Sequence, residues 1–380
     1  MSESPTNVVD RVLIVGGGVA GGVLGLSLAQ HGVEVILVDQ RDTLRGVGHG
    51  ITLQGNALKA FDSVGIYQTL AERGHPFNSL RLKTADGDLI AEIPTPPMGG
   101  PDLPGTMGAL RGDIADVLAD ELPKAGVDVR LETTLTKIDD HGDSVTVTLS
   151  DGTEETVDLL VGADGIRSTV RSMIGIDTEP RPVGMGIWRT VAKRPAEADC
   201  SELYYGGPKY KAGLTPISED LCYAFLIEEN LDRSLVGEGP RGAEFKERGQ
   251  GYGGHWGQIR DGLPDDAIVN YQWIEAICVE SPWFRGRTVL IGDAAHACPP
   301  LIAQGAAMGS EDAMVLGEML TGGGTLDEVL PAFMERRFPR VKMVLDNSLL
   351  LADWEMHPDT PGADPGRIMG ETLHALVTPA

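Results

Sequence analysis

One stretch near the start of the chain limits its possible folds more than any other: RVLIVGGGVAGGVLGLSLAQHGVEVILVD, residues 11–39. Val12 to Val15 form an apolar run that is typical of a central strand in a parallel sheet. A glycine-rich turn follows at 16–22, and small apolar residues to about Gln30 suit a closely packed helix before a second strand at 33–38. The stretch therefore predicts a βαβ unit with a dinucleotide bound at its glycine turn.

The spacing of the glycines assigns a task to each of them. Gly16 suits the tight turn, Gly18 the close approach of a pyrophosphate, and Gly21 the contact between helix and strand. Asp39 ends the second strand, where an acid bonds a ribose hydroxyl. A glycine turn without a ligand is the structural alternative. Flavin and nicotinamide dinucleotides use the same glycines, so this motif leaves the choice between them open.

Length and charge restrict the class of protein. A chain of 380 residues is long enough for roughly two domains. Its net charge of -25 argues against binding to nucleic acid or to an anionic membrane. The first ten residues lack the features of a signal peptide, and no apolar run approaches the ~20 residues that span a bilayer, so we expect a cytoplasmic protein. The four cysteines lack metal-ligand spacing, which predicts reduced structural thiols and no metal.

A second acid follows a buried strand in VDLLVGADGIRSTVR, residues 157–171. Asp164 ends the apolar run, and Gly165 lets the chain turn at once, which leaves a carboxylate at the edge of the sheet where ligands bind. Arg167 and Arg171 lie one helical turn apart and would supply positive charge there. The structural alternative is a solvated acid beside two surface arginines.

A third segment, TVLIGDAAHACPPLIAQGAAMGSEDA, repeats this pattern at residues 288–313. Asp293 ends a buried strand, the loop carries two prolines, and a helix is expected to open near Gly305. The start of that helix would favour negative charge, such as that of a reduced flavin. We interpret Glu311 and Asp312 as first-turn acids that stabilise the helix dipole.

The remaining patterns suggest an α/β protein whose cofactor domain is interrupted by β-rich insertions. Asp86 and Gly87 predict a hairpin turn, residues 180–281 are strand-like, and Pro339 is expected to kink or break the last long helix. We divide the chain into a cofactor domain at 1–75, 104–180 and 282–335, a substrate domain at 76–103 and 181–281, and a helical segment at 336–380.

Together the three glycine- and acid-containing segments resemble the class A flavoprotein aromatic hydroxylases, of which para-hydroxybenzoate hydroxylase is the best-known member. The resemblance covers GGGVAG at 16–21, GADGIRSTVR at 162–171 and GDAAHACPPLIAQGAAMGSEDA at 292–313, whereas 180–280 match only in general character. It implies a Rossmann-like FAD-binding domain of the para-hydroxybenzoate hydroxylase type, an inserted β-sheet substrate domain and C-terminal helices. Here His49 replaces a common small residue, and Ala303 a frequent glycine.

The resemblance also implies contacts to FAD, residue by residue. The pyrophosphate would be held by Gly16, Gly18 and Gly21, the adenosine end by Asp39 and Arg41, and the middle of the cofactor by Arg111. Asp164 would serve both FAD and a transient nicotinamide, and Asp293 the stretch from pyrophosphate to ribityl chain. The flavin ring would be lined by the loop from Pro299 to Ala307, including Gly305 and Ala306, and by the backbone of Gly50 and Ile51.

The reaction that the resemblance implies uses tightly held FAD, NADH or NADPH as a transient reductant, and O₂. A flavin C4a-hydroperoxide would hydroxylate a small phenolic or heteroaromatic substrate. The catalytic candidates are His49, Pro300 and Tyr223, and Arg189 is a candidate for binding a substrate carboxylate. Packing in the protein core is an equal alternative for the aromatic candidates of the insertion: Tyr204, Tyr205, Tyr210, Tyr223, Tyr271, Trp273 and His255.

Two other functions stay open from the sequence. One is a related FAD oxidoreductase, such as an epoxidase or a reductase, that acts on a non-aromatic substrate. The other is a non-catalytic nucleotide sensor, although no appended interaction domain is evident. The sequence does not distinguish a monomer from a homodimer.

Overall fold

The structure is a computed structural model that describes residues 7–46, 48–280 and 282–380. Residues 1–6, Val47 and Ser281 lie outside the described residues. They include part of the N-terminal segment considered for a signal peptide, one residue of the loop before Gly50, and the last residue of the predicted substrate domain.

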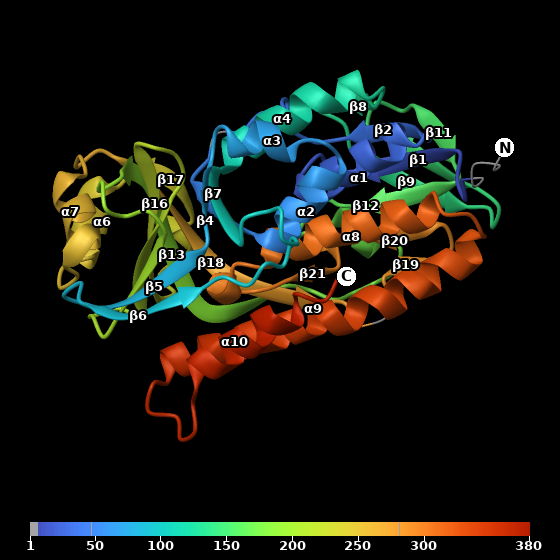
Figure 1. Cartoon of the computed structure of the whole chain (residues 1–380). Helices are drawn as coiled ribbons and strands as arrows, with labels where there is room; N and C mark the ends of the chain where they lie inside the picture. The colour runs from blue at the N-terminus through green and yellow to red at the C-terminus, as the bar shows by residue number, and fades with distance from the viewer. Residues whose placement is uncertain (1–6, 47, 281) are drawn as a thin grey trace.

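A six-stranded sheet forms the half of the molecule that contains the N-terminus (Figure 1). Its order is β19 (Phe284–Arg285), β20 (Thr288–Leu290), β12 (Leu159–Gly162), β1 (Arg11–Val15), β2 (Glu34–Val38) and β8 (Asp128–Arg130). All pairs are parallel except β19 with β20. Because parallel strands end at one edge, the chain segments after β1, β2, β12 and β20 meet there.

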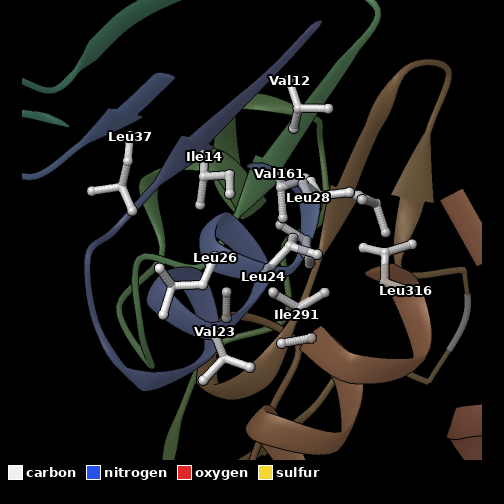
Figure 2. Close-up of a cluster of buried hydrophobic side chains, with 14 of the residues drawn as sticks. Val12, Ile14, Val23, Leu24, Leu26, Leu28, Leu37, Val161, Ile291 and Leu316 are labelled. Atoms are coloured by element: carbon white, nitrogen blue, oxygen red, sulfur yellow. The ribbon is translucent and has the colours of Figure 1, made fainter. Parts of the chain in front are cut away.

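Apolar strands and a glycine-rich helix make the core beneath this edge. Helix α1 (Val19–Gln30) contacts both the sheet and α8 (Gly305–Leu320). Figure 2 shows Val12 and Ile14 of β1, Leu24 of α1 and Leu316 of α8 in one cluster of buried hydrophobic side chains. These four side chains are fully buried. Burying one such side chain stabilises the fold by about 2 kcal/mol, so this core fixes the glycine turn relative to α8.

A nine-stranded sheet forms the other half of the molecule (Figure 1). It follows the order β17 (Gly237–Pro240), β18 (Ile268–Cys278), β13 (Arg181–Lys193), β16 (Leu221–Glu229), β15 (Lys211–Pro216), β14 (Ser201–Tyr205), β5 (Ser79–Thr84) and β6 (Leu89–Pro94), with β21 (His296–Ala297) beside β18. One face packs against α6 (Gly242–Arg248) and α7 (Gly254–Gly262). The opposite face carries Tyr223 and Phe225 and meets Leu301 and Leu351.

Two small sheets and the remaining helices complete the fold. The small sheets are β9 (Leu135–Asp140), β10 (Val145–Leu149) and β11 (Glu154–Val157), and β3 (Gly50–Gln54), β7 (Thr106–Leu110) and β4 (His75–Phe77). The helices are α2 (Gly55–Ser63), α3 (Tyr67–Ala71), α4 (Arg111–Lys124), α5 (Thr169–Met173), α9 (Leu326–Met356) and α10 (Pro365–Ala375), with short 3₁₀ turns η1 (Arg233–Leu235), η2 (Gly292–Ala294) and η3 (Pro300–Ile302). Helix α9 runs along both halves of the molecule (Figure 1).

The βαβ unit at 11–38 and the hairpin of β5 and β6, with Gly87 at φ +100°, confirm two local predictions. The strand-like prediction for 180–281 is incomplete, because α6 and α7 lie within it. The prediction that Pro339 breaks the last long helix is wrong. Helix α9 continues through Pro331 and Pro339 for 31 residues, since its buried side chains are packed along its length.

None of the helices in the described part of the chain combines the length and the apolar character that a bilayer span requires. The division of the chain into domains remains a prediction.

Candidate active site

The glycine turn has the shape that a pyrophosphate needs. Gly16 lies at φ +106°, and a Cβ there would come within 2.4 Å of the Ala163 carbonyl oxygen. At Gly21 a Cβ would lie 2.0 Å from the Gly16 carbonyl oxygen, whereas at Gly18 nothing lies within 4 Å. Two glycines therefore permit close backbone packing, and the third leaves open space at the start of α1, where unpaired N–H groups attract an anion.

Asp39 follows β2 at the same edge and is 7% exposed. Its carboxylate accepts hydrogen bonds from Gly17 N and from the backbone and side chain of Arg41. These bonds hold the pKa of Asp39 below its usual value, although burial acts in the opposite direction. The Arg41 side chain remains about half exposed. The acid thus orders both the glycine turn and Arg41, and a direct bond from Asp39 to ribose stays a prediction.

Asp164 lies at the end of β12 and caps helix α5. Its carboxylate accepts bonds from Thr169 N at 2.7 Å and from the Ser168 hydroxyl. Arg171 is 1% exposed and donates to the carbonyl oxygens of Ala294 and Ile166, so its charge is directed into the protein. The interpretation of Arg171 as positive charge for a ligand is therefore wrong. A cofactor contact of Asp164 remains a prediction.

Asp293 and Arg111 lie close enough for their charges to interact. Both are solvent-exposed, yet protein surrounds them so closely that loss of hydration dominates their titration. Burial raises the pKa of Asp293 and lowers the pKa of Arg111, which the charge of Arg189 lowers further. At Gly305, which begins α8, no atom lies within 4 Å of an added Cβ.

These residues fit FAD. The open backbone at Gly18 suits the pyrophosphate, Arg111 would supply a cation, and the start of α8 at Gly305, Ala306 and Ala307 would present N–H groups to the negative side of a flavin ring. Gly50 and Ile51 begin β3 and pair with Leu110 and Ala109 of β7, directly before Arg111.

Two acids of α8 have a different role from the one predicted. Glu311 and Asp312 are not in the first turn, because α8 begins at Gly305, and both are buried. Arg337 of α9 donates to Asp312 at 2.8 Å and to Glu311 at 2.7 Å, and His296 lies 2.6 Å from Asp312. The prediction of dipole-stabilising acids is wrong, since these carboxylates form a buried ion network. Arg337 is 26 residues away in sequence, and no local pattern indicated the contact.

The network reaches the loop that is predicted to line the flavin through amide side chains. Arg340 binds Glu311 through two bonds, at 2.7 and 2.8 Å, and Asn56 joins Glu311 to Gln304 at the start of α8. Pro300 is exposed and begins the 3₁₀ turn η3, in which its carbonyl oxygen accepts from Ala303 N at 3.3 Å. Ala303 takes the left-handed conformation, with φ 54° and ψ 35°. The loop that replaces a frequent glycine with alanine is therefore strained there.

A second group of side chains meets where β3 contacts the large sheet. Gly50 lies against Tyr223, since an added Cβ would be 2.3 Å from the Tyr223 Cβ. His49 Nε2 lies 3.3 Å from Arg189 Nη1, and the His49 and Tyr223 ring centres are 6.4 Å apart. Burial and the charges of Arg189 and Arg111 lower the pKa of His49 to about 3. His49 is thus uncharged at neutral pH.

The structure separates several other candidates from this group. Tyr204 and Tyr271 belong to the cluster on the opposite face of the sheet. Tyr204 donates to Glu202, to which His255 also bonds. The Tyr271 hydroxyl accepts from Leu231 N, and Trp273 donates to the Leu231 carbonyl oxygen. These four side chains therefore have structural partners, whereas Tyr205 and Tyr210 lie on or beside the face that bears Tyr223.

A separate hollow of about 590 Å³ lies between the segment before β13, the end of β18, and α9. It is lined by groups of both charges, including Arg181, Glu280 and Lys342, and by none of the predicted site residues. The candidate site is therefore defined by its converging side chains, not by this hollow.

All four cysteines are free thiols.

Comparison with known proteins agrees with this geometry. A family model described as FAD binding domain matches residues 10–348. YetM of Bacillus subtilis (strain 168) is 31% identical over 371 residues, covering 96% of this chain and 98% of its own. The 2-heptyl-3-hydroxy-4(1H)-quinolone synthase of Pseudomonas aeruginosa is 32% identical over 353 residues, which is 90% of each chain.

Solved structures show the same fold. Klebsiella pneumoniae HpxO complexed with FAD and uric acid aligns with a TM-score of 0.79 at 20% identity, covering 97% of this chain and 92% of that one. The chain therefore belongs to the FAD-dependent monooxygenases of the class A aromatic hydroxylase family.

Proposed function

We propose that this monooxygenase hydroxylates a small phenolic or heteroaromatic ring, with NADH or NADPH as the reductant. The observation that carries the proposal is the meeting of His49, Arg189 and Tyr223 beside Gly50, next to the residues predicted to hold the flavin. When bound, FAD would supply the redox chemistry, namely the uptake of hydride from the nicotinamide and the activation of O₂. The quinolone synthase among the relatives supports a heteroaromatic substrate, because its name describes such a ring.

The chain's own contribution to the reaction is electrostatic. The charge of Arg189 lowers the pKa of Arg111, so the two guanidinium groups lie near each other, and in an acidic protein they form a local cationic site. A phenol placed there would lose its proton more readily, because the two guanidinium groups stabilise the phenolate. The phenolate is the more electron-rich ring. We assign Arg189 to the substrate's anionic oxygen, and Tyr223 to hydrogen bonding with the same ring.

We assign His49 a positioning role. Its Nε2 faces Arg189, and its Nδ1 is buried without a hydrogen-bond partner among the described residues. Neither nitrogen is therefore available to take a proton directly from a substrate. A neutral imidazole that accepts a bond from Arg189 instead orients the guanidinium group toward the ring.

The experiment is to measure NADH and NADPH oxidation and O₂ uptake by the FAD-loaded protein, with and without a panel of phenols, hydroxypyridines and hydroxyquinolines. Stimulated oxidation together with a hydroxylated product supports the proposal. Arg189→Met should raise the KM for a responding phenol about tenfold, since a charged hydrogen bond is lost. A protein that no aromatic compound stimulates contradicts the proposal and favours a non-aromatic substrate.

A further inference from the structure

The segment from Gly292 to Gln304, which we call the cofactor loop, lies between β20 and α8 and is linked at both ends to acids of α8. Gly292 N donates to Asp312 Oδ2 at 2.9 Å. At the other end, the Asn56 amide nitrogen donates to Gln304 Oε1 at 3.0 Å and to Glu311 Oε1 at 2.9 Å. These four side chains are buried. The distance between the two ends of the loop therefore depends on two adjacent residues of one helix.

Each of these acids divides its hydrogen bonds between the cofactor loop and α9. Asp312 Oδ2 accepts from the loop, and its Oδ1 accepts from Arg337 Nε at 2.8 Å. Glu311 Oε1 accepts from Asn56, and its Oε2 accepts from Arg337 Nη1 at 2.7 Å. Arg337 is fully buried and also donates to the Met308 carbonyl oxygen at 3.2 Å. Through the two carboxylates, α9 is thus connected to both ends of the cofactor loop.

The same network reaches the C-terminal tail, residues 376–380, through Arg340. Its guanidinium group binds Glu311 and donates to the carbonyl oxygens of Leu376 at 3.0 Å and Thr378 at 2.9 Å. Burial acts to raise the pKa of Glu311, yet the charges of both arginines and the bonds that it accepts hold this pKa below its usual value. Glu311 is therefore ionised at neutral pH, and one carboxylate joins the loop, α9 and the tail.

Ala303 shows that the end of the cofactor loop is held in place. Its φ of 54° is unfavourable for alanine, and such strain persists only where the surroundings fix the backbone. The next residue, Gln304, supplies that constraint through its bond from Asn56. Hydrogen bonds are directional, whereas apolar contacts are not. A movement of α9 on α8 would thus shift Asp293 and Pro300, the loop residues that are predicted to lie beside FAD.

We propose that Glu311 and Asp312 are positioning residues that couple the cofactor loop to α9 and the C-terminal tail, so that FAD binding and docking of the tail strengthen each other. Coupling between two sites is reciprocal: if the docked tail favours FAD binding, bound FAD favours the docked tail by the same factor. The inference depends on FAD binding, which belongs to the family, and not on the identity of the substrate.

Hydrogen exchange of the full-length protein, with and without FAD, tests this coupling. The amide groups of Leu376 and Val377 donate to carbonyl oxygens of α10, so their exchange reports how often the tail opens. Saturating FAD should slow their exchange about tenfold in the wild type. Gln304→Met removes the bond from Asn56, so FAD should then slow the exchange less than about twofold. FAD should also bind this variant about fivefold more weakly.

A second variant, Arg340→Met, breaks the network on the side of α9. It should also remove the effect of FAD on the exchange of the tail and weaken FAD binding about fivefold. Arg248→Met is the matched control. Arg248 is also a partly buried arginine bonded to two acids, Glu228 and Glu244, but it lies on α6, away from the cofactor loop. This control should keep the wild-type FAD affinity and the wild-type protection of the tail by FAD.

Urea denaturation of the FAD-free proteins shows where each variant is folded, and both measurements are made under those conditions. The inference is overturned if FAD does not slow exchange in the tail of the wild type. It is also overturned if Gln304→Met and Arg340→Met lower the stability but keep the wild-type FAD affinity and tail protection, because the network would then only stabilise the fold. If Gln304→Met does not fold, Arg340→Met decides between these outcomes.

Discussion

Two regions of this protein hold charged groups away from bulk water, and they treat charge in opposite ways. Between α8 and α9, Glu311 and Asp312 are matched by Arg337 and Arg340, and hydrogen bonds join all four. In the candidate active site, the charge of Arg111 interacts both with a second cation, Arg189, and with one enclosed acid, Asp293. Compensated charges fix a structure, whereas uncompensated charges are suited to an anionic ligand.

The largest expected effect comes from breaking the compensated network. Arg337→Met leaves Glu311 and Asp312 buried with fewer partners, and we expect a loss of about 3–5 kcal/mol in the free energy of unfolding. Urea denaturation measures this loss in the free energy of unfolding. The neighbouring Arg336 binds Glu318 at the surface, with side chains 36% and 62% exposed, so Arg336→Met should cost less than about 1 kcal/mol. Similar losses for both variants would show that the buried network stabilises the fold no more than the surface ion pair does.

The second prediction concerns the uncompensated region. Arg111→Met should weaken FAD binding by about ten- to a hundredfold, because a cation that hydrogen-bonds the cofactor is worth roughly 1.5–3 kcal/mol. The FAD-free protein should unfold at nearly the same urea concentration, since Arg111 is poorly hydrated and near another cation. Fluorescence titration with FAD measures the affinity, and Arg45→Met, at an exposed arginine, is the control for the change in net charge.

If Arg111→Met instead unfolds several kcal/mol more easily and still binds FAD as tightly as the wild type, Arg111 belongs with the structural charges. Arg111 would then stabilise the fold and would not serve to bind an anionic ligand. The same titration with Asp293→Asn asks whether this acid also contributes to FAD binding.

The sequence predicted the features of the site that depend on local pattern. Gly16, Gly18 and Gly21 lie within one turn, and Asp39, Asp164 and Asp293 each follow an apolar run, so strand ends and turns were visible from adjacent residues. Parallel strands then place those ends at one edge. That is why the fold and a dinucleotide site could be predicted before the structure, whereas the choice of FAD came from the family resemblance.

The sequence could not predict contacts that depend on where distant elements pack. Glu311 and Asp312 looked like acids at a helix start, because Arg337 reaches them only through the packing of α9 on α8. Lys211 and Glu355 are 144 residues apart, and their pairing requires both the register of β15 and the path of α9. No periodic pattern in the sequence around Lys211 or Glu355 indicated that their charges would pair.

The third prediction tests whether burial, together with the charges of Arg189 and Arg111, keeps His49 uncharged, through the pH dependence of stability. His49 has a pKa of about 3 in the folded protein against an ordinary value of 6.5. Between these values the unfolded chain binds the proton and the folded protein does not, so the stability that His49 contributes is lost as the pH falls. The loss should be up to about 1 kcal/mol per pH unit below pH 6.5.

His49→Gln should therefore lose less stability than the wild type between pH 6.5 and pH 4, as measured by urea denaturation at each pH. His141 is exposed, and His141→Gln should follow the wild-type curve. Parallel curves for His49→Gln and the wild type would mean that neither burial nor the charges of Arg189 and Arg111 lower the pKa of His49 in solution.

The smallest expected effect lies in the loop that joins the two regions. Ala303 adopts a left-handed conformation, with φ 54°, directly before Gln304, which is bonded to the buried network through Asn56. Alanine is strained in this conformation and glycine is not, so Ala303→Gly should stabilise the protein by up to about 1 kcal/mol. Ala119→Gly, inside α4, should instead destabilise it by about 1 kcal/mol. If both changes destabilise, the network does not hold Ala303 in a strained conformation, and the loop reaches the flavin site by a different backbone path.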